Sequence, residues 1–600
     1  MASSTGIQGD DFRYLIVRPD KGGIWDVLKY SLRGDIECGS KFLESSDQGV
    51  VGGEAADHRW IILVSIVARR IIHFLGKPME LTGYGVDFFL NLLSQNGSLF
   101  GLFYNLLRGD IVIPKRGTET FISTIGHLDE RMDLYQAKNL VGDLHNSTPG
   151  EGIKNVELDD RATMDLCMMA SKLAYENAEV VRNVVVHHWK QLMTLKSACL
   201  QRMQMHFVDF YDCWDGPFLF NGALIPFVIG NHFIDYQKKK STQVFLLCDK
   251  PKDATLILIS FRGTEPFDAD DWSTDFDYSW YEIPNLGKLH MGFLEALGVG
   301  NREDTASFHY HLQKRGTKHC YPEAAKVESS NEGPHSEGSA GIDKKGIPPE
   351  MLEMSAYYVV REKLKTLFEE HKNAKYIVTG HSLGGALAIL FPIVLVLHDE
   401  TNLLQKLLGV YTFGQPRVGN KQLGRFMEAH LNHPVPKYFR VVYCNDLVPR
   451  LPYDDKTFLY KHFGVCLYYN SCFIEQKMDE EPNKNYFGIT HMIPEHLIAI
   501  WELIRSLTMG YTHGPEYKEG WFSIFLRVLG LSMPGIAAHC SVNYVNSVRL
   551  GKSDMPAAGP AIVFALKFSL VCNSVCKLFS PCITTSILLV SSYQYYPCQQ

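Results

Sequence analysis

The stretch KYIVTGHSLGGALAIL at residues 375–390 constrains the fold more than any other part of the chain. β-forming residues lead directly into Gly380, and good helix formers follow Gly384. A sharp turn from strand to helix strains the backbone at its tip, and flanking glycines remove the collisions that side chains would cause there. We therefore predict a nucleophile elbow that exposes the Ser382 hydroxyl, with the Leu383 N–H as a donor to a developing oxyanion. The alternative is a glycine-rich turn with a capping serine.

The segments around this elbow alternate between strand and helix patterns. The runs at 242–248 and 254–261 predict a β-hairpin, and 352–371 has the pattern of an amphipathic helix. Further strands are predicted at 409–416 and 437–445, each ended by glycine or proline. This order is typical of a mostly parallel sheet in the α/β class.

An elbow serine needs an acid and a base, and the segment RVVYCNDLVPRLP supplies the candidate acid. Asp446 lies just past the end of a predicted strand, where carboxylates of α/β sheets face the ligand site. Asp454 and Asp455 are competitors, but they come later in an exposed turn. The chain order Ser, Asp, His that is typical of such folds also favours Asp446, whose alternative is a turn-capping role.

Five histidines follow Asp446, and any of them is a candidate base: His462, His491, His496, His513 and His539. Two of them fall on a predicted helix, THMIPEHLIAIWELIRSL, which we expect Pro494 to break, and His513 lies in a glycine-flanked turn. A base must orient its imidazole between hydroxyl and carboxylate, which a loop position suits. Spacing alone therefore makes His539, predicted in a loop, only a modest favourite.

The second oxyanion donor is predicted in LILISFRGTEPFDADDW. Thr264 follows the hairpin strand and Gly263, so its backbone N–H and hydroxyl are placed to reach a substrate oxygen. A simple turn at the strand end is the alternative.

The remaining segments define the domain organisation. Residues 1–58 are polar, 161–205 have a helical pattern, and 301–349 read as a flexible insert. The apolar region 59–160 contains a charge-free run at 88–107 that is interrupted by amides. Buried helices and helices lying on a lipid surface fit this run equally well. The apolar tail 552–600 is either a membrane-seeking segment or a translation artefact.

Composition excludes several classes of function. A formal net charge of -7, from 59 basic and 66 acidic residues, gives no reason to expect nucleic acid as a partner. The 14 cysteines show no zinc spacing, and the start of the chain lacks a secretory signal. We therefore expect no metal, no structural disulfides and an intracellular, non-secreted protein.

The ordered motifs SFRGT, HMGF, TGHSLGGALA, TFGQPRVGN and NDLVPRLP, with the His539 segment, resemble the class 3 lipase family. The agreement is best with its branch of plant oil body triacylglycerol lipases, which GPEYKEGW and NYVNSVRLG also resemble. The resemblance covers about 242–550 and implies an α/β-hydrolase fold, with the lipase domain at 161–551 and a helical, apolar N-terminal region. The tail 552–600 resembles nothing in that family.

The resemblance also implies roles for individual residues. Ser382 is then the nucleophile, Asp446 the orienting acid and His539 the base, with Tyr544 at the expected five-residue spacing after the base. Thr264 matches the oxyanion position, and EPFDADDWSTDFDYSWY matches the family's mobile lid. No organic cofactor is required.

The implied function is a triacylglycerol lipase that cleaves long-chain acylglycerols at the surface of a lipid droplet, or oil body, or of an intracellular membrane. A phospholipase A1 or galactolipase acting on membranes is a second enzymatic hypothesis. A lipase-like protein that binds lipid without catalysis is a third. The sequence does not give an oligomeric state.

Overall fold

The computed structural model describes residues 12–129, 160–189, 204–213, 242–312, 355–453, 459–484, 486 and 489–553. It divides into two compact units, Met1–Gly551 and Lys552–Gln600. Of the second unit only β13 (Lys552–Ser553) is described, so the predicted apolar tail lies outside the described residues.

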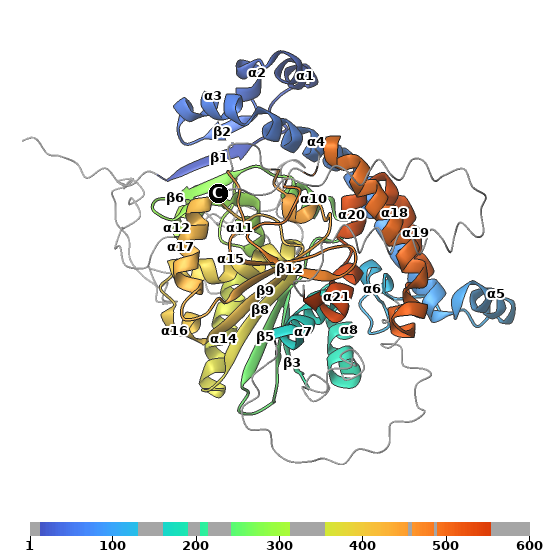
Figure 1. The fold of residues 1–600 in the computed structure, drawn as a ribbon. Coiled ribbons are helices and arrows are strands. Elements are labelled where there is room, and N and C mark those ends of the chain that lie inside the picture. The colour runs from blue at the N-terminus through green and yellow to red at the C-terminus, as the bar shows by residue number, and fades with distance from the viewer. Residues whose placement is uncertain are drawn as a thin grey trace, which may run out of the picture. The chain divides into compact units, whose positions relative to one another are not determined.

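A mostly parallel sheet forms the centre of the first unit (Figure 1). Its strand order is β12-β11-β10-β9-β8-β5-β4-β3. The five middle strands run parallel: β5 (Leu256–Phe261), β8 (Lys375–His381), β9 (Leu407–Phe413), β10 (Tyr438–Tyr443) and β11 (Val465–Tyr469). Antiparallel strands flank them: β3 (His206–Cys213), β4 (Thr242–Cys248) and β12 (Ile474–Met478). The predicted hairpin and the predicted α/β class are both confirmed.

Helices cover both faces of this sheet because its strands are apolar on both sides. In β5, Ile257 and Ile259 join one core, whereas Leu256 and Leu258 join the other. The first core is shared with α11 (Met291–Leu297), α14 (Ala356–Glu370), α15 (Leu383–Leu397) and α17 (Lys421–Leu431). The second is shared with α7 (Asp160–Leu173), α8 (Ala178–Asn183) and α21 (Ser541–Leu550).

The N-terminal residues build a second, smaller sheet with the order β2-β1-β6-β7. Here β1 (Arg13–Val17) pairs with β2 (Leu43–Ser45) and with β6 (Trp280–Ile283), which pairs in turn with β7 (Gly287–His290). The short helices α1 (Ile24–Arg33), α2 (Ile36–Ser40) and α3 (Gln48–Asp57) lie beside it. The start of the chain is thereby paired with Trp280 and Tyr281, the last two residues of the segment that resembles a lid.

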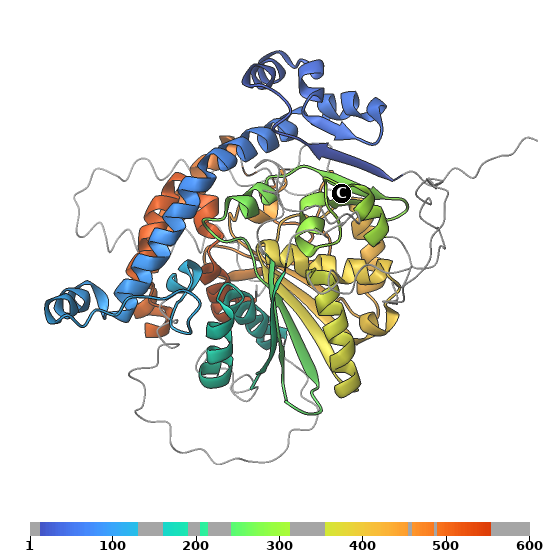
Figure 2. The same ribbon diagram turned by 180° about the vertical axis from the view of Figure 1, so that it is seen from behind.

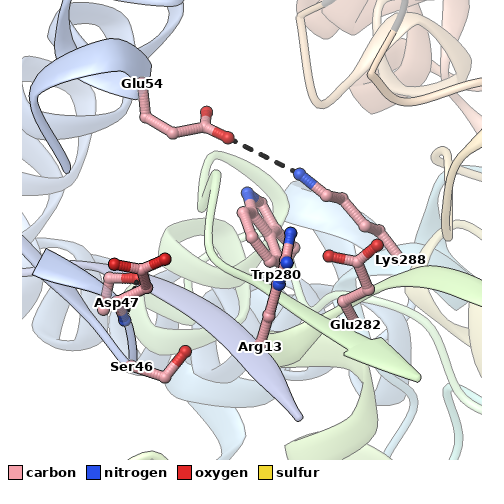
Figure 3. Close-up of a pocket in the computed structure, with 8 residues that line it drawn as sticks. Arg13, Ser46, Asp47, Glu54, Trp280, Glu282 and Lys288 are labelled. Atoms are coloured by element: carbon pink, nitrogen blue, oxygen red, sulfur yellow. Dashed lines mark hydrogen bonds and ion pairs between the residues drawn. The ribbon is translucent and has the colours of Figure 1, made fainter. Parts of the chain in front are cut away.

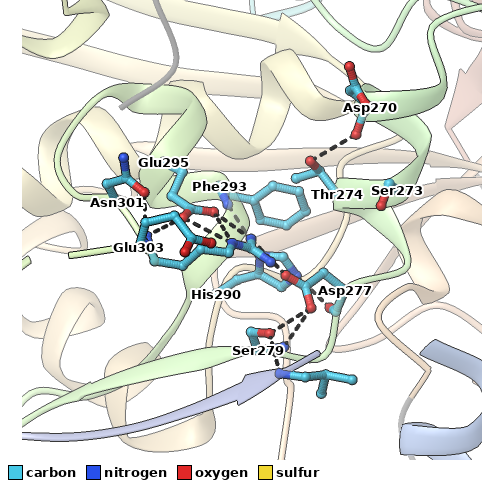
Figure 4. A network of polar contacts seen from close by, with 12 residues as sticks. Asp270, Ser273, Thr274, Asp277, Ser279, His290, Phe293, Glu295, Asn301 and Glu303 are labelled. Atoms are coloured by element: carbon cyan, nitrogen blue, oxygen red, sulfur yellow. Dashed lines mark hydrogen bonds and ion pairs between the residues drawn. The ribbon is translucent and has the colours of Figure 1, made fainter. Parts of the chain in front are cut away.

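A buried ionic cluster strengthens this connection. Asp277 accepts hydrogen bonds from Arg69 of α4 (Arg59–Gln95) and from Ser279, and Arg302 lies 2.9 Å from its other oxygen. Figure 4 shows Asp277 beside Ser279 and His290, whose ring lies 2.7 Å from the Asp277 carbonyl oxygen. These contacts attach α4 to the segment that follows α10 (Ala269–Asp275).

The region expected to be buried or to lie on lipid forms two helices, α4 and α5 (Ser98–Arg108) (Figure 2). Asn91 of α4 is buried and bonds the backbone of Ile122, so part of this helix packs on the domain. No residue of α5 is buried. Among the described residues, no helix is long and apolar enough to cross a membrane.

The structure refines two local expectations. The helical pattern predicted at 161–205 corresponds to two successive helical segments in the described residues, because α7 ends at Leu173 and Asn177 caps α8; residues 190–203 lie outside the described part. The insert predicted from 301 begins later, since α12 (Ala306–Leu312) buries Phe308 in the core.

Pro494 does not break its helix. It lies near the start of α18 (Ile489–Thr512), where it removes one backbone donor without ending the helix. After α18 come α19 (Trp521–Leu529) and α20 (Pro534–Ala538), so the loop predicted around His539 is partly helical.

Candidate active site

The turn between β8 and α15 has the geometry of an elbow. Ser382 has a left-handed φ of 59°, a conformation that a non-glycine residue rarely adopts. A Cβ atom on Gly380 would lie 2.1 Å from the Gly384 carbonyl oxygen, and one on Gly384 would lie 2.3 Å from that of Phe261. The glycines are therefore required by backbone packing. Leu383 is the first residue of α15, and N–H groups in the first turn of a helix have no acceptor within the helix.

Asp446 and His539 are in direct contact. The Asp446 carboxylate is fully buried just beyond β10, and its Oδ2 lies 2.8 Å from His539 Nδ1. The Tyr544 hydroxyl donates to the same oxygen, and the Val448 N–H donates to the other at 2.9 Å. These donors fix the carboxylate, which in turn orients the imidazole. The other ring nitrogen of His539 is buried and has no hydrogen-bond partner among the described residues.

His381 connects this pair to the elbow. It immediately precedes Ser382, and its ring stacks on that of His539 at a centroid distance of 4.6 Å. Its Nε2 lies 3.1 Å from the His539 carbonyl oxygen, and its Nδ1 lies 2.8 Å from the Tyr175 hydroxyl. Burial and the nearby His539 hold the pKa of His381 well below its usual value, which favours a neutral ring that packs rather than titrates. The sequence analysis did not single out His381 or Tyr175.

Thr264 lies on a backbone segment that presses against the elbow. A Cβ on Gly263 would lie 2.3 Å from the His381 carbonyl oxygen and 3.0 Å from Ser382 Cβ. Only glycine permits this approach, which brings the neighbouring Thr264 close to the serine. The structure thus gathers Ser382, Asp446, His539, Thr264 and Leu383 at the carboxyl ends of neighbouring parallel strands, where α/β folds bind ligands.

Asp275, at the end of α10, is a site residue that the sequence analysis missed. The Thr264 hydroxyl donates to Asp275 Oδ2 at 3.1 Å, and Oδ1 is buried without a hydrogen-bond partner among the described residues. Burial raises the pKa of Asp275 to about 7, against an opposing influence of His539 and the Thr264 hydrogen bond. The segment that resembles a lid therefore contacts the candidate oxyanion residue directly. Several carboxylates occupy residues 265–277, so no short sequence pattern singles out Asp275.

The rejected histidines have other environments. His462 Nε2 lies 2.7 Å from the Pro449 carbonyl oxygen, and burial lowers its pKa to about 3. His491 and His496 belong to α18, and His513 follows it. None of the four is hydrogen-bonded to Asp446. Asp454 and Asp455 lie outside the described residues.

A separate polar pocket lies between the small sheet and α3 (Figure 3). Its charges are partly matched internally, because the Lys288 ammonium lies 3.5 Å from the Glu54 carboxylate and 3.4 Å from the centre of the Trp280 ring. The described residues contain no group of three or more His, Cys, Asp or Glu side chains suited to a metal ion.

Comparisons with known proteins agree with this arrangement. The model of the family described as Lipase (class 3) matches residues 258–456. The chain is 55% identical to triacylglycerol lipase OBL1 of Nicotiana tabacum, over 90% of this chain and 95% of that protein. It is 54% identical to triacylglycerol lipase OBL1 of Arabidopsis thaliana, over 90% and 96% of the two chains.

A solved Rhizomucor miehei lipase propeptide complex is 18% identical over 52% of this chain and 68% of that one, with a TM-score of 0.28. A similarity of that size adds nothing to the fold assignment, which rests on the strand order. The extended identity to the two plant relatives decides the family. The chain belongs to the class 3 lipases, together with the plant OBL1 proteins, and is a carboxylic ester hydrolase.

Proposed function

We propose that this protein is a triacylglycerol lipase that acts at the surface of a lipid droplet, through Ser382, His539 and Asp446. The observation that carries the proposal is the 2.8 Å contact between Asp446 and His539, beside a serine held at a left-handed φ of 59°. The names of the plant relatives support the substrate, and the exposed apolar side chains of α5 support the location.

In the proposed mechanism, Ser382 Oγ attacks the acyl carbonyl carbon while His539 Nε2 takes the hydroxyl proton. The carbonyl π electrons move to oxygen, and the N–H groups of Thr264 and Leu383 hold the resulting oxyanion. When the intermediate collapses, the ester C–O bond breaks and His539 returns its proton to the departing diacylglycerol oxygen. The Asp446 carboxylate stabilises the imidazolium formed in between.

Water then completes the cycle. His539 removes a proton from a water molecule as it attacks the acyl-enzyme, and returns the proton to Ser382 Oγ when the fatty acid leaves. The Thr264 hydroxyl donates its hydrogen to Asp275 and is therefore not the oxyanion donor. The contact instead holds the residue whose backbone N–H takes that role. Removing a single oxyanion donor raises the activation barrier by about 2.7–4 kcal/mol.

The test is fatty-acid release from a triolein emulsion and from phosphatidylcholine vesicles, with wild-type protein and the Ser382→Ala variant compared. We expect release from triolein that disappears in the variant, while the thermal unfolding midpoint is retained. Release from vesicles alone would instead indicate a phospholipase. If the wild-type protein also fails to cleave a soluble short-chain ester, the enzymatic proposal is wrong and a lipid-binding role remains.

A further inference from the structure

The helices α18 and α19 have their charged residues on the inside. All Asp, Glu, Lys and Arg residues within these two helices are buried: Glu495, Glu502, Arg505 and Arg527. A surface helix of a protein surrounded by water normally shows the opposite arrangement, with its charges outward and its apolar stripe toward the core.

The buried charges attach the two helices to the catalytic domain. Glu502 accepts a hydrogen bond from the Tyr443 hydroxyl at 2.7 Å, and Arg505 donates to the same hydroxyl at 3.0 Å. Arg527 donates to Glu519 at 2.7 Å and to Asn543 of α21 at 2.8 Å. Polar contacts therefore help to hold this helix pair in place, beside buried apolar residues such as Met509 and Phe522.

Other apolar side chains of these helices point outward. The outer face, as we call it, comprises the exposed large apolar residues of α18, α19 and the α20 region: Met492, Ile493, Leu497, Ile500, Ile504, Leu507, Tyr511, Trp521, Phe525, Val528, Leu529, Met533 and Ile536. Tyr511 is 93% exposed and Ile493 73%. Contiguous exposed apolar surface of this extent marks a contact with a partner or with lipid.

The outer face continues onto the N-terminal helices. Leu90 of α4 and Phe522 of α19 belong to one small buried cluster, against which Val86 and Leu526 also pack. Beyond this contact α4 and α5 expose further large apolar side chains: Phe74, Leu81, Phe88, Phe89, Leu99, Phe100, Phe103, Leu106 and Leu107. Segments about 400 residues apart in sequence thus share one buried cluster, and each exposes large apolar side chains.

The outer face is also continuous with the candidate active site. Met533 and Ile536 are exposed at the start of α20 and within it, and His539 follows the end of that helix directly. The Gly535 carbonyl accepts a hydrogen bond from the Leu447 N–H, next to Asp446. A lipid surface in contact with this face would lie close to the residues that we expect to cleave the ester.

We propose that the outer face of α18, α19 and α20 docks on the phospholipid monolayer that covers a triacylglycerol droplet, as the second half of a surface begun by α4 and α5. This inference rests on the proposed function, since it names the surface on which that site works. None of the described helices is suited to cross a bilayer, so the helices lie in the plane of the boundary with apolar side chains among the acyl chains. Trp521 and Tyr511 suit the headgroup level.

The charge distribution makes the proposal specific. The described part of α18 and α19 exposes no Lys or Arg, whereas α4 and α5 expose Lys77 and Arg108. Docking of the outer face therefore depends on apolar burial and not on anionic headgroups. Binding to droplets coated with zwitterionic phosphatidylcholine should therefore persist at high salt. A docking site based on basic residues would behave in the opposite way.

The experiment is flotation of the full-length protein with triolein droplets coated with phosphatidylcholine. The test variant carries Leu497→Gln, Ile504→Gln and Leu507→Gln, all on the outer face. The control variant carries Val186→Gln, Leu408→Gln and Val435→Gln, which are similarly exposed apolar positions elsewhere. Cleavage of a soluble short-chain ester and the thermal unfolding midpoint report whether each variant is folded.

We expect at least a tenfold lower droplet-bound fraction for the test variant, with unchanged ester cleavage and midpoint, and no change for the control. Wild-type binding should remain in 0.5 M NaCl. Equal flotation of wild type and test variant would overturn the proposal. It would also be overturned if the wild type stayed off the droplets because a second copy or its own C-terminal segment covers the outer face.

These outcomes are independent of catalysis. Ser382→Ala should float like the wild type, because docking does not need the nucleophile. If the wild-type protein floats with the droplets but does not hydrolyse triolein, the proposed function is wrong, whereas the proposed docking surface is supported.

Discussion

The Thr264 hydroxyl donates a hydrogen bond to the buried carboxyl of Asp275 at 3.1 Å. This contact joins the loop after β5 to the end of α10, and thereby joins the candidate oxyanion donor to the segment that resembles a lid. Because Asp275 contacts Thr264, a change in the protonation of its carboxyl affects both the loop after β5 and the end of α10.

Asp275 should make stability depend on pH. Burial raises its pKa to about 7, above its value in an unfolded chain, so the folded state binds the proton more tightly. Stability should therefore fall as pH rises from about 4 to 7 and level off above that range. In Asp275→Asn this component disappears, so the difference in unfolding midpoint between variant and wild type should grow in favour of the variant up to pH 7. A difference that does not change with pH would contradict this account.

Gly384 should not tolerate a side chain. In Gly384→Ala the new Cβ would lie 2.3 Å from the Phe261 carbonyl oxygen, which is backbone and cannot move aside easily. We expect a loss of about 3 kcal/mol or more in the free energy of unfolding, together with loss of ester cleavage. Gly85→Ala is the matched control, because a Cβ there meets nothing within 4 Å. Because Gly85 lies within helix α4, Gly85→Ala should raise the free energy of unfolding by roughly 0.5–1 kcal/mol. Denaturant titration measures both.

Tyr544 should support catalysis by holding Asp446. Tyr544→Phe removes the hydroxyl that donates to Oδ2, the oxygen that contacts His539. A hydrogen bond to a charged group contributes about 1.5–3 kcal/mol, so kcat/KM for a soluble ester should fall roughly 10- to 100-fold. Steady-state kinetics should place the loss in kcat and not in KM. An unchanged kcat would show that Val448 alone is enough to orient the carboxylate.

Arg69 should be essential for attaching α4. It is buried, and its guanidinium donates to Asp277 at 2.9 Å and to the Val17 carbonyl. Arg69→Met removes one partner of a buried ion pair, which should destabilise by about 3–5 kcal/mol.

The pair of Arg116 and Asp87 provides the control for Arg69, because Arg116 is half exposed. Arg116→Met should cost less than about 1 kcal/mol. Nearby arginines hold the pKa of Asp277 below its usual value despite burial. Its contribution is therefore present above the ordinary carboxyl pKa and should be lost in acid. Similar unfolding midpoints for Arg69→Met and Arg116→Met at neutral pH would contradict the role assigned to Arg69.

The sequence predicts the elbow and Asp446 from local patterns, whereas His539 was favoured mainly by the family resemblance. Ser382 lies between required glycines, and Asp446 follows a strand, so each is visible in a short pattern. Asp275 could not be selected in this way, since several carboxylates crowd the same stretch and only packing decides which one meets Thr264.

The sequence also could not predict which face of α18 packs against the domain. Helical periodicity shows that apolar and charged residues occupy opposite faces, but it does not show which face turns inward. Here the contacts of Glu502 and Arg505 with Tyr443 decide the orientation. The helix break predicted at Pro494 was also wrong, because a proline near the start of a helix removes only one backbone hydrogen bond.

The central claim is that Ser382 forms the acyl-enzyme with His539 as its base. The most direct measurement is mass spectrometry of the protein after reaction with a long-chain alkyl fluorophosphonate, which traps an activated serine. The account predicts one adduct per chain, located on the peptide that contains Ser382, and greatly slowed labelling in His539→Ala. Labelling at another serine, or triolein hydrolysis that continues in the fully labelled protein, would contradict it.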